Sequence, residues 1–180
     1  MKAHLALGVP PPFIKFSRHL LPVMKHLWFQ QALAIPGLGA HLVSEQRQRL
    51  PRYLFEHFTL DAASWSSEVI ETYVAQLREP DRARAASSLY RHLVLPESLR
   101  ILRGDYRRTR LPTPTLVLFG AADSAFPPAL ANRVVQDHRT YADHVEVGFV
   151  AGAAHLIADE RPDAVVDHAR EFFPRHATGF

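Results

Sequence analysis

The sequence contains no cysteine among its 180 residues. This absence excludes a disulfide framework, a zinc ribbon and a thiol nucleophile, and it is compatible with a reducing compartment. Only 8 residues are glycine and only 22% are charged, too few for a collagen-like or disordered chain. Stability must therefore come from burying the apolar residues, which make up 47% of the sequence and include 11 phenylalanines. We expect a soluble globular domain.

Long uninterrupted apolar runs are also absent. The most apolar stretch, residues 13–38, is broken by Lys15, Arg18 and Lys25, whereas a membrane span needs roughly 18 to 20 uncharged residues. The N-terminal segment has neither the long apolar region nor the small-residue cleavage site of a secretory signal. We therefore expect a cytoplasmic protein without a membrane span.

Positive charge is in small excess, because 21 Lys and Arg residues face 18 Asp and Glu residues and give a net charge of +3. The densest basic group contains Arg100, Arg103, Arg107, Arg108 and Arg110. No RNA-binding or helix-turn-helix signature accompanies it. We interpret this group as a solvated surface and expect no nucleic-acid partner.

Three apolar runs have the composition of β-strands. They are residues 4–9, which end at Pro10, residues 115–119, which lie between Pro114 and Gly120, and residues 144–150. A continuous run such as 115–119 is typical of a strand buried on both faces of a parallel sheet. The fold class that we expect is α/β, with about three parallel strands and flanking helices.

Between these runs the apolar residues recur every three or four positions, which predicts helices. One helix is expected from residue 13 to about 33, a second after the N-cap hydroxyl of Ser66, and a third that ends at Pro96. Pro128 is expected to start another. The helix opened by Pro162 is expected to face the sheet with Val165, Val166, Ala169, Phe172 and Phe173.

Two chemically active residues follow two of the expected strands. Asp123 comes after residues 115–119, and His155 comes after residues 144–150. Neighbouring parallel strands end at the same edge of a sheet, where ligands and catalytic groups lie. The carboxylate would then accept a hydrogen bond from one imidazole nitrogen while the other acts as a general base. In the alternative, Asp123 caps a turn and His155 is an ordinary loop histidine.

The segments around this pair resemble motifs of the α/β-hydrolase family. Residues 111–123, which end in Phe-Gly-Ala-Ala-Asp, resemble the strand and loop that present the triad acid. Residues 152–162, which begin Gly-Ala-Ala-His, resemble the loop of the triad histidine and the last helix. The order of acid before histidine also fits. The resemblance implies the C-terminal portion of an α/β-hydrolase fold, with a partial core formed by residues 1–12 and 97–180.

The middle of the chain, residues 13–96, is similar to the helical lid of epoxide hydrolases and their dehalogenase-like relatives. Trp28 and Phe29 lie in a segment that resembles the first lid helix, and Tyr90 lies in one that resembles the end of the lid. In that branch two lid tyrosines hold the epoxide oxygen, so the resemblance implies a catalytic role for Tyr90. Phe29 stands at the second position and has no hydroxyl, so Trp28 and Phe29 are expected to bind substrate as apolar pocket residues. A core aromatic is the alternative for Tyr90.

The sequence has no Gly-x-Ser-x-Gly or Gly-x-Asp-x-Gly motif to supply a nucleophile. We therefore expect a truncated or degenerate hydrolase, nearly inactive as this chain, whose substrate class is an apolar small molecule such as an ester, epoxide or haloalkane. No cofactor is expected. No metal site is expected either, because none of the eleven histidines stands in a His-Glu-x-x-His or comparable spacing.

Two other functions stay open at this point. The chain could be a non-catalytic module that binds a small molecule or an interaction partner, or a fragment of an ester hydrolase or haloalkane dehalogenase. In every case the strand at residues 4–9 is expected to expose a sheet edge, which favours self-association.

Overall fold

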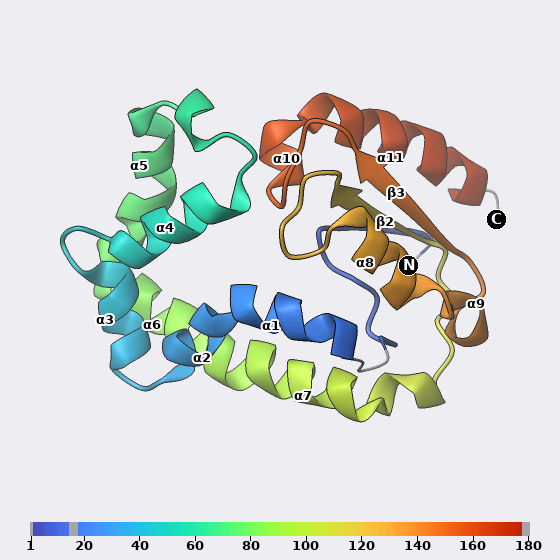
Figure 1. Cartoon of the computed structure of the whole chain (residues 1–180), viewed down its shortest axis with the longest axis horizontal. Helices are drawn as coiled ribbons and strands as arrows, with labels where there is room; N and C mark the ends of the chain where they lie inside the picture. Colours follow the sequence, from blue (N-terminus) through green and yellow to red (C-terminus); the bar gives the residue numbers. More distant parts are fainter. Residues whose placement is uncertain (1, 15–17, 178–180) are drawn as a thin grey trace.

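A three-stranded parallel sheet forms the centre of the computed structural model, which describes residues 2–14 and 18–177. The strands are β1 (His4–Leu7), β2 (Thr115–Gly120) and β3 (Val145–Val150), in the spatial order β1-β2-β3 (Figure 1). In the register, Thr115 pairs with both His4 and Val145. The three parallel strands expected from the sequence are confirmed, and their carboxyl ends share one edge of the sheet.

Helices cover both faces of this sheet. Because side chains alternate along a strand, Val117 and Phe119 of β2 pack on the side of α8 (Pro128–Val135), whereas Leu116 and Leu118 pack on the side of α11 (Pro162–Ala177). All of β2 is buried, as its apolar run predicts. Each fully buried Leu or Phe side chain contributes about 1.5–3 kcal/mol to folding, so β2 anchors the layer from which the loops extend. Two short helices complete this part, α9 (His138–Tyr141) and α10 (Ile157–Glu160).

The chain between β1 and β2 forms a helical segment, residues 18–108, with a core of its own. Figure 1 shows α3 to α6 gathered beside the sheet, with α1 and α7 running back toward it. Its apolar centre includes Phe29, Leu33, Val43 and Phe58. The helices are α1 (Leu21–His26), α2 (Trp28–Ala34), α3 (Leu38–Ser44), α4 (Arg49–Phe58), α5 (Ser67–Ala75), α6 (Pro80–Leu89) and α7 (Leu95–Arg103). Single turns of 3-10 helix lie at Arg18–Leu20, Ala62–Ser64, Gln76–Arg78 and Asp105–Arg108, and a π-helix at Tyr90–Val94 joins α6 to α7.

The prediction of a single helix over residues 13–33 was wrong. Phe13 lies in a turn and packs into the sheet core beside Val117, which draws it away from any helix. The helical part is divided at Leu27, where α1 ends and α2 begins. Residues 15–17 of the expected helix lie outside the described residues. Tertiary packing of Phe13 therefore outweighs the apolar periodicity.

The helix that the sequence predicted to end at Pro96 instead continues. Tyr90–Val94 forms a π-helix, and Pro96 lies in the first turn of α7. A proline is tolerated there because its missing N–H would make no bond within the new helix. By contrast, Ser66 caps α5 by accepting the Val69 N–H at 3.2 Å, and α8 begins at Pro128, as predicted.

The last helix faces the sheet with only part of the apolar set that the sequence predicted. Val165 and Phe172 pack against the sheet core, whereas Val166 and Phe173 are 44% and 39% exposed. Each exposed residue follows one of the two packed residues by one position, a rotation of about 100° around the helix, so the predicted inward direction of Val166 and Phe173 was wrong. This helix is the longest described, with 16 residues. None of the described helices has the length and apolarity that a membrane crossing requires.

Candidate active site

The loops that follow β2 and β3 are joined by backbone hydrogen bonds. The Ala122 N–H donates to the Ala153 carbonyl at 3.0 Å, and the Ala121 N–H donates to Val150 at 2.9 Å. Gly120 ends β2 at a point where a Cβ atom would overlap the Ala154 carbonyl. The absence of a side chain at Gly120 therefore allows the two loops to lie against each other.

The Asp123 carboxylate is the buried centre of this loop pair, with 1% of the residue exposed. Its Oδ1 accepts hydrogen bonds from the backbone N–H groups of Ala125 at 2.8 Å and Phe126 at 3.1 Å, and its Oδ2 lies 2.8 Å from Nδ1 of His155. Burial by itself would raise the pKa of Asp123, but the hydrogen bond and charge of His155, together with the two N–H donors, outweigh it and hold the pKa below its ordinary value. The carboxylate therefore stays ionised at neutral pH.

His155 is held from three sides. Its N–H donates to the Phe58 carbonyl at 3.0 Å, and its ring lies against the Phe58 ring with centroids 5.2 Å apart. Gly8, with a φ of +65°, follows β1 and lies so close that an added Cβ would stand 3.1 Å from Cε1 of the imidazole. Because a carboxylate only accepts hydrogen bonds, the proton shared with Asp123 belongs to Nδ1, and Nε2 is the nitrogen available for chemistry.

Glu160 joins the loop that carries His155, residues 151–156 (the histidine loop), to the helical segment. Its Oε2 accepts the Ala154 N–H at 2.7 Å, and its Oε1 accepts the Leu60 N–H. The residue before His155 and the residue two positions after Phe58 are thus bonded to the same carboxylate. Phe58, Gly8 and Glu160 were not singled out from the sequence, because each acts through a contact between segments far apart in the chain.

A cavity of about 600 Å³ lies between the helical segment and the histidine loop. His155, Tyr90 and Phe29 all line it, with Phe58 and other mostly apolar side chains. Ring contacts run from Tyr90 to Phe29 at 6.0 Å, from Phe29 to Phe58 at 5.9 Å and on to His155. The cavity therefore offers an apolar volume of ligand size with the imidazole in its wall.

Tyr90 occupies the first position of the π-helix. Single π-turns occur frequently at functional sites. Burial raises the pKa of Tyr90, so its hydroxyl stays protonated at neutral pH and can donate a hydrogen bond. Among the described residues its hydroxyl has no hydrogen-bond partner, which leaves it available to a ligand.

Trp28 does not line this cavity. It is 48% exposed on α2, and its ring stands 6.4 Å from the ring of Tyr53 on α4. Its neighbour Phe29, one position along the helix, is buried and lines the cavity. Adjacent residues of a helix point about 100° apart, so the structure brings Phe29 but not Trp28 to the cavity.

A second polar pair lies in the cavity wall. The Tyr73 hydroxyl of α5 donates a hydrogen bond to Oδ1 of Asp159 on α10. That bond, with some burial and the carboxylate charge, raises the pKa of Tyr73. The contact joins the helical segment to the helix after His155 and adds polar groups to a mostly apolar cavity wall.

Comparison with known proteins places this geometry in a known fold. No protein-family model matches the chain, and no curated protein matches it. Many solved structures resemble it, among them the following three. The epoxide hydrolase CorEH has a TM-score of 0.70 at 21% identity, and the match covers 97% of this chain and 59% of CorEH. A protein from Nostoc sp PCC 7120 assigned to the alpha/beta hydrolases has a TM-score of 0.72 at 16% identity, with coverage of 96% and 58%.

The third structure is a Salmonella enterica protein assigned as an acyltransferase, with a TM-score of 0.75 at 13% identity and coverage of 97% and 56%. The chain has an α/β-hydrolase fold. Identities this low establish the fold alone, and one fold carries several chemistries. The chain spans between 56% and 59% of the length of these three structures, which is consistent with a C-terminal portion of the fold.

Proposed function

We propose that this chain carries the acid–base part of an α/β-hydrolase site that acts on an apolar small molecule. The proposal rests on the 2.8 Å contact between the buried Asp123 carboxylate and Nδ1 of His155, a residue that lines a mostly apolar cavity. In this assignment His155 is the general base, and Asp123 positions it.

The proton transfers follow from the donor and acceptor roles of the pair. Asp123 accepts the Nδ1 hydrogen, which fixes the tautomer and leaves the Nε2 lone pair to take a proton from water. In an ester, the water oxygen bonds to the carbonyl carbon as this proton leaves, and the imidazolium that forms is stabilised by the adjacent carboxylate. The C–O bond to the leaving alkoxide then breaks, and the imidazolium returns its proton to that alkoxide. Asp123 remains ionised throughout, in agreement with its lowered pKa.

Tyr90 is proposed to donate a hydrogen bond to the oxygen on which negative charge develops. Its protonated hydroxyl lines the same cavity as His155, and Phe29 provides an apolar wall beside it. Phe29 has no second hydroxyl to offer. Because one oxyanion donor is worth about 3 kcal/mol, opening of an epoxide would be slower here than in a site with two tyrosines.

The nucleophile is the part that this sequence does not contain, because no Gly-x-Ser-x-Gly or Gly-x-Asp-x-Gly motif occurs in it. Loss of the nucleophile from a catalytic triad lowers the rate by several orders of magnitude. We propose that the chain by itself performs only slow, base-assisted hydrolysis. In the same proposal residues 13–96 serve as a lid over a partial core of residues 1–12 and 97–180, and β1, at the sheet edge, is a site of self-association.

The missing nucleophile motif also favours a second function, a module that binds an apolar small molecule without turning it over. Both functions use the cavity. They differ in whether the imidazole of His155 contributes to hydrolysis.

Ligand binding tests the cavity. The full chain is titrated with an unreactive apolar amide while the imidazole signals of His155 are followed by NMR. The expected result is a saturable shift of those signals that is weakened in Tyr90→Phe and unchanged in Tyr53→Phe, a tyrosine that contacts Trp28 and not the cavity. Absence of any shift at His155, or equal weakening in both variants, would contradict the assignment.

Hydrolysis of an apolar p-nitrophenyl ester distinguishes the two functions. The slow rate of the full chain is expected to fall in His155→Gln and to stay unchanged in His92→Gln, an exposed histidine of the π-helix. Binding of the amide together with equal hydrolysis rates in both variants would support the non-catalytic module.

A further inference from the structure

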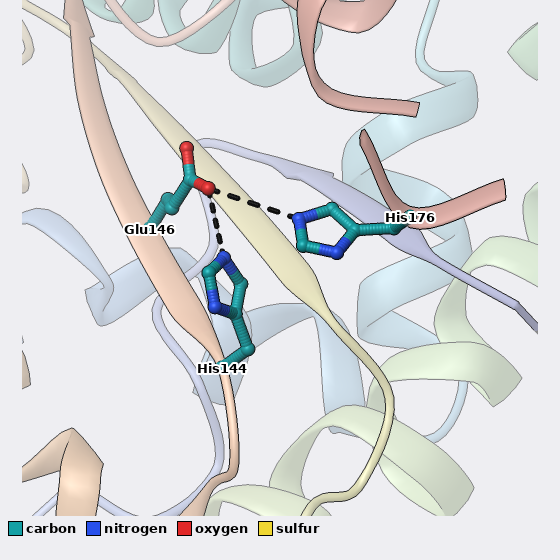
Figure 2. A group of neighbouring side chains, drawn as sticks. All are labelled: His144, Glu146 and His176. Atoms are coloured by element: carbon teal, nitrogen blue, oxygen red, sulfur yellow. Dashed lines mark hydrogen bonds and ion pairs between the residues drawn. The ribbon is translucent and has the colours of Figure 1, made fainter. Parts of the chain in front are cut away.

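A second group of titratable side chains lies at the opposite end of the sheet from Asp123 and His155. His144 directly precedes β3, and Glu146 is the second residue of that strand. Residues two apart on a strand point to the same side, here toward α11, whose last turn carries His176. Figure 2 shows both imidazoles directed at the Glu146 carboxylate.

One carboxylate oxygen is the meeting point of the three side chains. Oε1 of Glu146 lies 2.8 Å from Nε2 of His144 and 3.8 Å from Nε2 of His176 (Figure 2). One ligand atom from each of the three residues lies within 4.8 Å of the other two. In the part of the chain that the structure describes, no other group of three metal-ligating side chains is this compact.

Nε2 of His176 is a buried polar atom without a hydrogen-bond partner among the described residues. The distance to Glu146 is too long for a hydrogen bond. The ring is held by Phe172, at 4.6 Å between centroids, and by His144, at 4.5 Å. A buried unpaired nitrogen is costly, and a ligand placed between the two imidazoles and Oε1 would satisfy it.

We propose that His144, Glu146 and His176 bind a zinc ion, with the fourth position open to water. Zinc takes imidazole nitrogen and carboxylate oxygen at about 2.0–2.2 Å in tetrahedral geometry, which sets neighbouring ligand atoms about 3.3 Å apart. The separations of 2.8 Å and 3.8 Å lie on either side of this value. Small rotations of the side chains are therefore enough to bring the three ligand atoms to these distances. Magnesium and calcium prefer oxygen ligands alone, and two imidazoles favour zinc.

Arg175 determines which carboxylate oxygen of Glu146 is available to the metal. Its guanidinium lies 2.9 Å from Oε2, the carboxylate oxygen that faces away from the imidazoles. Glu146 therefore offers only Oε1 to the metal. The positive guanidinium also opposes a divalent cation, so its removal is expected to strengthen binding.

Bound zinc would join the last turn of α11 to the start of β3. Glu146 and His176 are 30 residues apart in the sequence, which explains why no local spacing indicates the site. Because the ion binds only the folded arrangement, it stabilises that arrangement by mass action. The proposal is independent of the function assigned to His155.

Zinc alone is the probe for the test. The full chain is titrated with Zn²⁺ in competition with a chromophoric chelator, and thermal unfolding is measured with and without the ion. We expect one equivalent to bind tightly and to raise the melting temperature. His144→Gln and His176→Gln are each expected to weaken this binding by at least the roughly 10–100-fold that loss of an outer-shell partner costs, and Arg175→Met is expected to strengthen it.

His41→Gln provides the matched control, since His41 is an exposed histidine of α3 far along the chain from the cluster. It is expected to bind zinc as the wild type does. Circular dichroism checks that each variant is folded. The proposal is overturned if the wild type binds no equivalent of zinc tightly, or if His41→Gln loses as much affinity as His144→Gln in folded protein.

Discussion

Replacing Asp123 in two ways separates two tasks of its carboxylate. Oδ1 accepts the N–H groups of Ala125 and Phe126, and Oδ2 accepts the hydrogen of His155 Nδ1. Asp123→Asn keeps an oxygen for the turn and loses the charge and the acceptor for His155. Asp123→Ala loses every one of these bonds and leaves two N–H donors unpaired at a position where the side chain has no exposed surface.

The magnitudes of these two losses differ. A hydrogen bond to a charged group contributes about 1.5–3 kcal/mol, and an unpaired buried donor costs about 1–3 kcal/mol. Asp123→Asn is therefore expected to lower the free energy of unfolding by about 2 kcal/mol and Asp123→Ala by about 4 kcal/mol. Urea unfolding followed by the fluorescence of Trp28 and Trp65 measures both.

Ser124→Ala is the control for this pair, because Ser124 is the exposed neighbour of Asp123 and its loss is expected to stay within about 0.5 kcal/mol. Equal losses of unfolding free energy in Asp123→Asn and Asp123→Ala would refute the assignment of Oδ1 to the turn and Oδ2 to His155. If both Asp123 variants lose no more unfolding free energy than Ser124→Ala, the Asp123 carboxylate does not stabilise the turn.

Three further predictions concern the same loops. Because the folded-state pKa of Asp123 is below its ordinary value, the stability advantage of the wild type over Asp123→Asn is expected in full above about pH 4 and to disappear as the pH falls through the lowered pKa; an advantage that grows on acidification would contradict this. Gly8→Ala is expected to cost about 1–2 kcal/mol for its positive φ and to displace the His155 ring in NMR spectra, whereas Gly37→Ala, also at positive φ but with open space around it, should cost the same and leave the ring unmoved. Glu160→Gln is expected to lower the free energy of unfolding by about 1 kcal/mol and to speed hydrogen exchange at the amides of Leu60 and Ala154; unchanged exchange at both would show that Glu160 does not fasten the loops.

The sheet and the Asp123–His155 contact could be anticipated because they depend on local signals. Runs of β-favouring residues closed by proline or glycine mark the strands, and parallel strands carry their following loops to one edge. Residues 115–119 illustrate this, since an uninterrupted apolar run leaves little choice but a central strand. The contact between the two loops then follows from strand order alone.

The errors arise where contacts between distant segments decide the outcome. Phe13 leaves its expected helix because the sheet core accepts it, and the helix around Pro96 continues because a π-helix precedes a proline in a first turn. The apolar periodicity correctly predicts that Phe173 lies in a helix, but it assigns this residue to the wrong face. Phe173 is one position after the buried Phe172 and therefore points in a different direction.

The residues that position the loop of His155 were missed for the same reason. Phe58, Gly8 and Glu160 reach the histidine loop from three other parts of the chain. None of them belongs to a local motif, so only the folded arrangement reveals them. Trp28 and Phe29 show the same limit, because a sequence pair gives no sign of which ring turns toward a cavity.

The position of one proton on the His155 ring decides whether Nε2 can act as the base. Long-range ¹H–¹⁵N NMR at about pH 9, where an ordinary histidine is neutral, reports which ring nitrogen of His155 carries hydrogen. We expect the Nδ1–H tautomer in the wild type, with Nε2 as an acceptor, and loss of that preference in Asp123→Asn. A wild-type ring protonated on Nε2 would contradict it, because Nδ1 would then have no hydrogen to donate to Asp123 and Nε2 could not serve as the base.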